Sequence, residues 1–338
     1  GRDAKLGATY AQQDKPPLLV LVLGETGRAG HFAINGYARP TTPHLSARND
    51  LVNAPNAWSC GTSTAASVPC MFSHLGRDGF ESRKANYESL IDVLHHAGLA
   101  VLWLDNQAGC KGVCERIGEV RTTALQDPVL CPGGECLDPI MLKDLDQRLA
   151  DLPAEQRRRG TVVVLHEMGS HGPAYFKRSA PALKKFQPEC TSTNLQECTQ
   201  EQVVNAYDNS IVQTDQFLDS VLNWLSDQSD KAQTAMIYVA DHGESLGENN
   251  IYLHGLPYSI APDVQKHVPW ITWLSPAMQA RTHVTTGCLQ QDVAQRRVTH
   301  DNYFHSVLGL MDVQTGAYSP ALDMFAGCRQ QPNGPLAG

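Results

Sequence analysis

The stretch Leu18-Leu-Val-Leu-Val-Leu23 is a continuous apolar run that stops at Gly24-Glu25-Thr26. An apolar run without alternation is typical of a strand that is buried on both faces of a parallel sheet. Similar runs recur along the chain at Leu99–Leu104, Thr161–Leu165, Thr234–Ala240 and Val268–Trp273. The fold is therefore expected to be built around a sheet of such strands.

Helical patterns alternate with these runs. The apolar spacing predicts helices over Ser89–His96, Met141–Leu149, Gln202–Ser226 and Tyr303–Met311. Buried strands that alternate with helices indicate an α/β fold with a mostly parallel central sheet and helices on both of its sides. With no sharp change in composition, we expect a single domain over 18–330, preceded by a polar linker remnant over 1–17.

Composition narrows the function classes. The chain has 338 residues and a net charge of −8, which argues against a nucleic-acid partner because no basic field is present to neutralise phosphates. The longest apolar run is far shorter than the roughly 20 residues that cross a bilayer. We therefore expect an extracytoplasmic domain from which any targeting segment has been removed.

The ten cysteines indicate an oxidising compartment, because eight of them fall in close pairs. Zinc knuckles are the alternative, but the pairs lack matching partners at the usual spacing. We expect five disulfides, namely Cys60–Cys70, Cys110–Cys114, Cys131–Cys136, Cys190–Cys198 and Cys288–Cys328.

A hydroxyl-rich stretch, Ser59 to Phe72, contains Thr62, Ser63 and Thr64 between two cysteines. Ser59 could cap a helix that starts near Thr62 and points its N–H groups at an anion. Such a stretch is usually structural, but it would also suit a covalent phosphoryl acceptor.

Polar residues follow the predicted strands at the edge where parallel strands place ligands. They are Glu25, Lys111, His166, His171, Asp241, His242 and, slightly further on, His254. Glu25, Asp241 and His242 form a mixed oxygen and nitrogen set that suits zinc, with a threonine hydroxyl as fourth ligand. Each residue alone has an ordinary structural explanation, whereas the set at one edge favours a metal site.

The chain resembles the phosphoethanolamine transferases that modify lipid A, a family that includes the mobile colistin resistance enzymes. The resemblance extends over about 18–312 and rests on Gly24-Glu25-Thr26, Ser59-Cys60-Gly61-Thr62-Ser63-Thr64, Val68-Pro69-Cys70-Met71-Phe72, His171-Gly172-Pro173-Ala174-Tyr175-Phe176-Lys177, Tyr207-Asp208-Asn209, Asp241-His242-Gly243-Glu244-Ser245-Leu246-Gly247-Glu248 and Leu253-His254-Gly255. It implies an alkaline-phosphatase-like three-layer α/β/α sandwich.

The resemblance also implies roles for matching residues. Thr64 would be the nucleophile and, with Glu25, Asp241 and His242, would hold a catalytic Zn²⁺. His171 and His254 would bind substrate phosphate or a second zinc, and Lys111 would contact the lipid phosphate.

The reaction implied is transfer of phosphoethanolamine from phosphatidylethanolamine to lipid A, in the periplasm of a Gram-negative bacterium and with resistance to polymyxins such as colistin. Family members carry an N-terminal membrane region, so this chain is expected to be the periplasmic domain of an inner-membrane protein.

Three alternatives stay open. A phosphatase or phosphodiesterase of the same superfamily would use water as acceptor, and a phosphoglycerol-type transferase would use another glycan. A disulfide-rich binding protein with a decayed site is the non-enzymatic alternative, which the intact ligand set disfavours. A sulfatase activity would need Cys-x-Pro-Ser-Arg, which Val68-Pro-Cys-Met71 does not provide.

Overall fold

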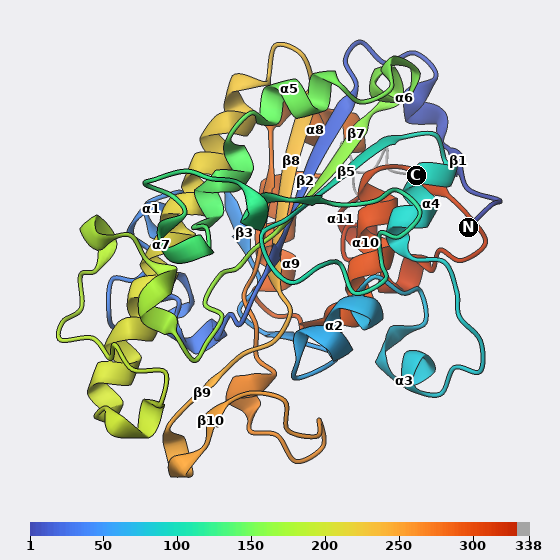
Figure 1. The fold of residues 1–338 in the computed structure, drawn as a ribbon. Coiled ribbons are helices and arrows are strands. Elements are labelled where there is room, and N and C mark those ends of the chain that lie inside the picture. The colour runs from blue at the N-terminus through green and yellow to red at the C-terminus, as the bar shows by residue number, and fades with distance from the viewer. Residues whose placement is uncertain (330–338) are drawn as a thin grey trace.

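A seven-stranded sheet forms the centre of the computed structural model, which describes residues 1–329 of the chain (Figure 1). The strand order is β3-β11-β8-β2-β7-β5-β6. In chain order these strands are β2 (Pro17–Gly24), β3 (Leu51–Asn53), β5 (Ala100–Asp105), β6 (Val120–Arg121), β7 (Thr161–His166), β8 (Gln233–Ala240) and β11 (Trp270–Leu274). The pairs from β8 to β6 are parallel, whereas β11 is antiparallel to both β8 and β3. The prediction of a mostly parallel sheet is thus confirmed.

The middle strand β2 lies between β7 and β8, with Leu23 opposite His166 on one side and Val239 on the other. Because these three strands run in the same direction, their carboxyl ends meet at one edge. The residues that follow each strand therefore begin side by side, which is what assembles the site described below.

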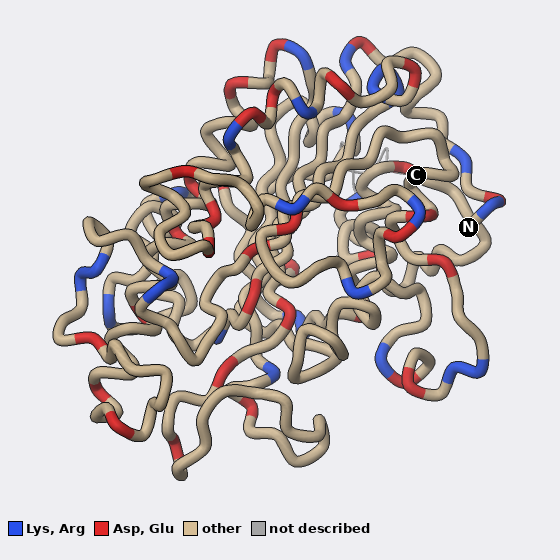
Figure 2. Tube along the Cα trace, in the orientation of Figure 1, with Lys and Arg blue, Asp and Glu red and all other residues tan. Residues whose placement is uncertain are grey.

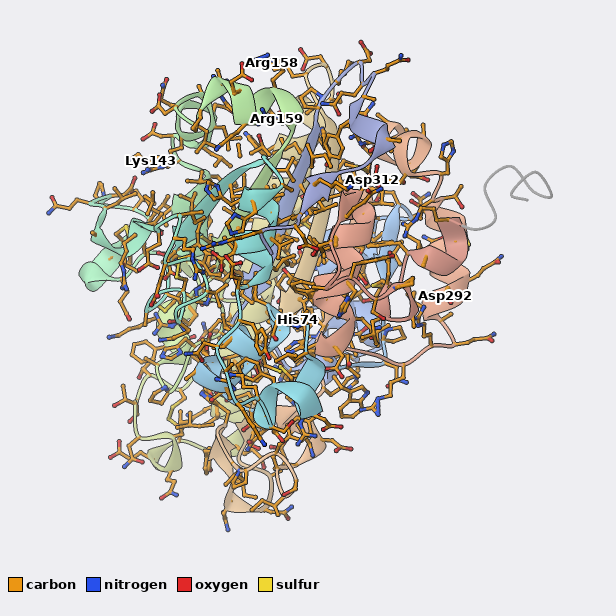
Figure 3. All side chains as sticks on the ribbon, turned by 90° about the vertical axis from the view of Figure 1, so that its right-hand side faces the viewer. His74, Lys143, Arg158, Arg159, Asp292 and Asp312 are labelled. Atoms are coloured by element: carbon orange, nitrogen blue, oxygen red, sulfur yellow. A yellow bond between two sulfur atoms is a disulfide. The ribbon has the colours of Figure 1, made fainter. Side chains whose placement is uncertain are left out.

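The side chains of β2 alternate between two separate cores. Leu19, Leu21 and Leu23 belong to one core, and Val20 and Val22 belong to the other. The long helix α7 (Gln200–Asp227) packs on the second face, while α4 (Leu90–His96), α8 (Pro276–Thr282) and α10 (Tyr303–Leu310) contribute to the first. The result is the expected three-layer arrangement, and side chains fill the space between the layers (Figure 3).

Shorter elements complete the fold. The remaining helices are α1 (Pro43–Ser46), α2 (Thr64–Met71), α3 (Gly76–Glu81), α5 (Leu145–Ala150), α6 (Ala154–Arg159), α9 (Thr286–Val293) and α11 (Ala326–Arg329). The remaining strands are β1 (Lys5–Leu6), β4 (Ala57–Trp58), β9 (Ser245–Leu246), β10 (Tyr252–Leu253), β12 (Val298–Thr299) and β13 (Val313–Gln314).

Two predictions need correction here. Residues 1–17, predicted as a linker, pack on the domain: β1 pairs with β13, and Tyr10 donates a hydrogen bond of 2.5 Å to the Met311 carbonyl. The helix predicted over Met141–Leu149 is interrupted, because Asp144 adopts a left-handed backbone (φ 59°) and α5 begins only after it. The predicted domain end, residue 330, lies outside the described residues.

No helix within residues 1–329 has both the length and the apolar character needed to span a bilayer. Along the Cα trace in Figure 2, lysine and arginine positions are interspersed with aspartate and glutamate positions.

Candidate active site

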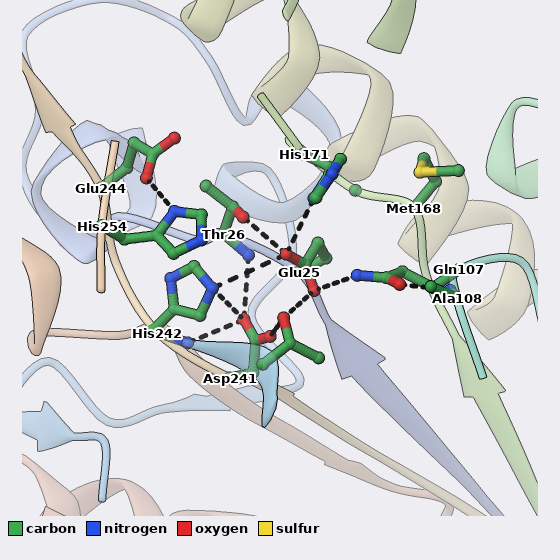
Figure 4. A network of polar contacts seen from close by, with 12 residues as sticks. Glu25, Thr26, Gln107, Ala108, Met168, His171, Asp241, His242, Glu244 and His254 are labelled. Carbon is green, nitrogen blue, oxygen red and sulfur yellow. Dashed lines mark hydrogen bonds and ion pairs between the residues drawn. The ribbon is translucent and has the colours of Figure 1, made fainter. Parts of the chain in front are cut away.

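Three segments bring the central residues of the site together (Figure 4). Glu25 follows β2 directly, Asp241 and His242 follow β8, and Thr64 is the first residue of α2. Thr64 Oγ1 donates to Asp241 Oδ2 at 2.5 Å and lies 2.8 Å from Glu25 Oε2. A hydroxyl is thus held between two carboxylates at the carboxyl edge of the sheet.

The position of Thr64 depends on the start of α2. Ser63, not Ser59, is the N-cap of this helix, and its Oγ accepts from the Ala66 N–H at 3.2 Å. The Ser59 hydroxyl is used elsewhere, because it donates to the Gly61 carbonyl at 2.6 Å. The predicted helix start near Thr62 is therefore two residues too early.

The carboxylates of this cluster are buried, and within residues 1–329 neither lies within salt-bridge distance of a lysine or arginine. Glu25 is 2% exposed, and Asp241 and His242 are fully buried. Burial opposes ionisation of Glu25, but its hydrogen bond with His171 and the nearby imidazole of His242 hold its pKa well below the usual value. Burial and the neighbouring Glu25 raise the pKa of Asp241 to about 7. Two buried carboxylates so close together are costly unless a cation compensates them.

His242 supplies the observation that fits a metal. Its Nδ1 lies 2.6 Å from the Gly243 carbonyl, to which it can donate. Its buried Nε2 makes no hydrogen bond and lies 3.6 Å from both Glu25 Oε1 and Asp241 Oδ1. Burial lowers the pKa of His242, but the two carboxylates outweigh it and raise the pKa to about 10.

The ligand atoms of Glu25, Asp241 and His242 lie within 4.8 Å of one another. An imidazole whose Nδ1 is engaged by a carbonyl is the usual form of a histidine ligand. The donor set thus fits a divalent metal such as zinc, for which Thr64 Oγ1 offers a further oxygen.

A second layer of hydrogen bonds fixes the carboxylates. Gln107 Nε2 donates to Glu25 Oε2 at 2.9 Å, and the Thr26 hydroxyl donates to Glu25 Oε1 at 2.8 Å. The Thr26 N–H donates to Asp241 Oδ1 at 3.0 Å. Such partners orient ligands and fix where their lone pairs point.

The two other predicted histidines stand at the rim of the cluster. His171, in the loop after β7, places Nδ1 3.3 Å from Glu25 Oε1, and its side chain is 40% exposed. This contact with Glu25 raises the pKa of His171 although burial opposes the shift. His254 Nδ1 lies 2.7 Å from Glu244 Oε1, and its ring is stacked obliquely on that of His242 at 4.1 Å. His242, Glu244 and His254 form a second group with the spacing of metal ligands.

Lys111 is not part of this hydrogen-bonded cluster. Its Nζ lies 3.5 Å from the Ala108 carbonyl, and the residue lines a surface pocket beside the other end of α2. His166, also placed at the sheet edge by the sequence, turns toward the first core and pairs with Asp105 at 2.7 Å.

The predicted Cys60–Cys70 disulfide is absent, and both residues are buried free thiols. Cys60 Sγ instead contacts the Ser67 carbonyl at 3.5 Å and His300 Nδ1 at 3.4 Å. In the same stretch, Thr62 Oγ1 donates to the Leu256 carbonyl at 2.5 Å. The other predicted disulfides are formed, which excludes zinc knuckles at those cysteines.

Gln107 and Glu244 were missed from the sequence. Gln107 lies two residues beyond the end of β5, so the same rule that selected Glu25 and Asp241 would have included it. Glu244 is within the motif that supplies His242, but a sequence cannot tell which way its carboxylate turns.

Comparisons with known proteins agree with this geometry. A protein-family model described as sulfatase matches residues 17–313. The chain is 44% identical over 98% of its length to phosphoethanolamine transferase EptA of Escherichia coli (strain K12), of which it covers 59%. It is 40% identical over 90% of its length to phosphatidylethanolamine transferase Mcr-1 of Escherichia coli, of which it covers 56%.

The fold is also similar to a solved structure, the soluble domain of lipooligosaccharide phosphoethanolamine transferase A from Neisseria meningitidis. The TM-score is 0.89 at 40% sequence identity, and the match covers 96% of both chains. The present chain spans less than two thirds of the length of the two sequence relatives named above.

Proposed function

Because the chain belongs to the sulfatase family, within its phosphoethanolamine transferases, we propose that it transfers phosphoethanolamine from phosphatidylethanolamine to lipid A. The observation that carries this proposal is the Thr64 hydroxyl, which lies between Glu25 and Asp241 beside the unpartnered Nε2 of His242. This arrangement is suited to making an alcohol nucleophilic.

Glu25, Thr64, Asp241 and His242 would hold a Zn²⁺ ion. Bound there, zinc would supply a Lewis acid that favours the alkoxide form of a threonine and offsets charge on a phosphoryl group. The chain itself contributes the pre-set geometry, since Gln107 and Thr26 hold the carboxylates before any substrate arrives.

In the first half-reaction, Thr64 Oγ1 gives up its proton and forms a bond to the phosphorus of phosphatidylethanolamine. The bond from phosphorus to the glycerol oxygen breaks, and diacylglycerol leaves after taking up a proton. In the second half-reaction, a lipid A oxygen loses its proton and attacks the same phosphorus. The bond to Thr64 then breaks, and Thr64 Oγ1 takes a proton back. His171 and His254 stand at the rim, where each could carry one of these protons or contact the phosphate.

The product would carry an added ammonium group, which lowers the negative charge of lipid A and weakens its attraction for cationic polymyxins. We accordingly place the reaction at the periplasmic surface of the inner membrane, with the remainder of a longer protein as the anchor.

Intact-mass analysis tests the covalent step. The zinc-loaded protein is incubated with phosphatidylethanolamine in detergent micelles, and we expect a phosphoethanolamine adduct that is absent from Thr64→Ala. Thr62→Ala is the matched control, because it removes a neighbouring hydroxyl that bonds to the Leu256 carbonyl and not to the cluster.

Two outcomes would contradict the proposal. If the mass of the zinc-loaded wild type stayed unchanged, the proposed covalent intermediate on Thr64 would be contradicted. An adduct that water discharges as fast in the absence of lipid A as in its presence would instead identify a phosphodiesterase.

A further inference from the structure

A surface pocket lies beside the C-terminal end of α2, whereas the Ser63 cap and Thr64 are at the N-terminal end of this helix. It has a volume of about 260 Å³ and includes Pro69, Phe80, Arg83, Tyr87, Glu88 and Lys111 in its wall. Pro69 stands five residues after Thr64 on the same helix, a rise of about 7.5 Å. The pocket therefore borders the helix that carries the nucleophile and lies outside the ligand cluster.

The wall of the pocket carries more positive than negative charge. Within residues 1–329, neither Arg83 nor Lys111 has a carboxylate within salt-bridge distance, although the chain is acidic overall. The one acid in the wall, Glu88, is already paired with His96 at 2.6 Å and Arg116 at 3.9 Å. The pocket is thus left with two uncompensated cations, which favours an anionic occupant.

Local structure holds the Arg83 guanidinium and fixes the backbone of Lys111. The Arg83 guanidinium lies 3.7 Å above the Phe80 ring, and one of its nitrogens donates to the Phe80 carbonyl at 2.8 Å. Lys111 has a left-handed backbone (φ 55°) inside the small ring closed by Cys110–Cys114. This conformation is uncommon for a residue with a side chain and is found most often where function requires it.

An aromatic side chain completes the pocket. Tyr87 is 58% exposed, one of few large apolar side chains so exposed among the described residues, and packs edge-on against His74 at 5.3 Å. A fixed, exposed aromatic ring next to cations offers a flat surface for a sugar ring and donors for its phosphate.

We propose that this pocket binds a phosphate-bearing sugar of the acceptor, with Arg83 and Lys111 on the phosphate and Tyr87 against the sugar. The inference rests on the proposed function, because it assigns the acceptor of that reaction to a place separate from the donor. It makes Arg83 and Tyr87 determinants of acceptor specificity that take no part in forming the adduct.

The two half-reactions separate this inference from the proposed function. Adduct formation on Thr64 is measured first with phosphatidylethanolamine alone, and discharge of the adduct is then measured against increasing lipid A. Arg83→Gln is expected to form the adduct at the wild-type rate but to need about tenfold more acceptor for half-maximal discharge. Tyr87→Ala is expected to need severalfold more acceptor than wild type for half-maximal discharge, whereas Tyr87→Phe is expected to need the same amount as wild type.

Lys84→Ala is the matched control, because Lys84 is an exposed neighbouring cation that does not line the pocket. Glucosamine 1-phosphate is expected to inhibit discharge in wild type and less so in Arg83→Gln, whereas inorganic phosphate and glucosamine are expected to inhibit weakly. Equal inhibition by inorganic phosphate would show that the pocket recognises phosphate alone, and would overturn the sugar assignment.

Two further results would overturn the inference. If Arg83→Gln slowed adduct formation, the pocket would belong to the donor. If Arg83→Gln needed the same lipid A concentration as wild type for half-maximal discharge of the adduct, the pocket would have no part in the reaction. Absence of any adduct in wild type would instead reject the proposed function, so the two failures are distinguishable.

Discussion

At the scale of single residues, Glu167 is a buried carboxyl that the proposed reaction does not use. It is fully buried, and neither of its oxygens has a hydrogen-bond partner. Burial and the nearby Asp138 raise its pKa well above the usual value. Asp138 accepts hydrogen bonds from the Met168 and Gly169 N–H groups, whereas Glu167 has no such donors.

Because the folded pKa of Glu167 exceeds the unfolded value, its contribution to stability is fully present below about pH 4.3 and is lost as pH rises toward the folded pKa. The slope is at most about 1.4 kcal/mol per pH unit. Glu167→Gln keeps the shape without the charge, so we expect it to unfold at higher urea than wild type at pH 8 and at similar urea at pH 4. A difference between the two proteins that does not change with pH would contradict this assignment.

Gln107 is the residue whose loss should reveal the metal site. Its amide donates to Glu25 Oε2 while its own oxygen accepts from the Ala108 N–H, which fixes its orientation. We expect Gln107→Ala to weaken zinc binding by about 10- to 100-fold, as measured by competition with a chromogenic chelator. Gln290→Ala is the control, since that amide donates to the Leu51 carbonyl away from the site and its loss should leave zinc affinity unchanged.

At the scale of elements, the start of α2 sets the position of the nucleophile. Loss of the cap in Ser63→Ala should cost about 1 kcal/mol of stability and also lower adduct formation, because Thr64 is the next residue. Thr199→Ala removes the equivalent cap of α7, whose capping box lies on the surface. It should cost a similar amount in urea unfolding and leave adduct formation unchanged. If Ser63→Ala and Thr199→Ala formed the adduct at the same rate, the Ser63 cap would not position Thr64.

The elements themselves could be predicted because burial on both faces leaves a clear pattern. The run Leu18–Leu23 is apolar throughout since its side chains serve two cores, and β7 and β8 follow the same rule. A parallel sheet then brings Glu25 and Asp241 together without any knowledge of the structure. The spatial arrangement of the predicted ligands thus followed from the topology, although their chemical roles remain proposals.

The remainder could not be predicted because tertiary contacts decide it. Ser59 was predicted to cap the helix, but its hydroxyl bonds to the Gly61 carbonyl, and Ser63 caps α2 instead. Spacing alone paired Cys60 with Cys70, whereas in the structure the Cys60 sulfur contacts the Ser67 carbonyl and His300 Nδ1. His300 is far from Cys60 in the sequence, so only the fold brings the two together.

At the scale of the whole molecule, the formed disulfides fasten loops of very different size. Cys288–Cys328 closes 40 residues and ties α9 to α11 across α10, whereas Cys190–Cys198 closes only 8 residues beside the start of α7. If a disulfide acts mainly by restricting the unfolded chain, the larger ring should contribute more. The large ring includes α10, whose side chains belong to the first core, so we expect its effect to reach that core.

We therefore expect the double variant Cys288→Ser/Cys328→Ser to lose about 4 kcal/mol of unfolding free energy, and Cys190→Ser/Cys198→Ser about 2.5 kcal/mol. Urea unfolding under non-reducing conditions measures both. Because Cys288 and Cys328 are remote from the carboxyl edge, adduct formation on Thr64 should persist in the first variant at temperatures where it stays folded. A loss no larger than that of the small ring would mean that native contacts around α10, rather than chain entropy, determine what this disulfide contributes.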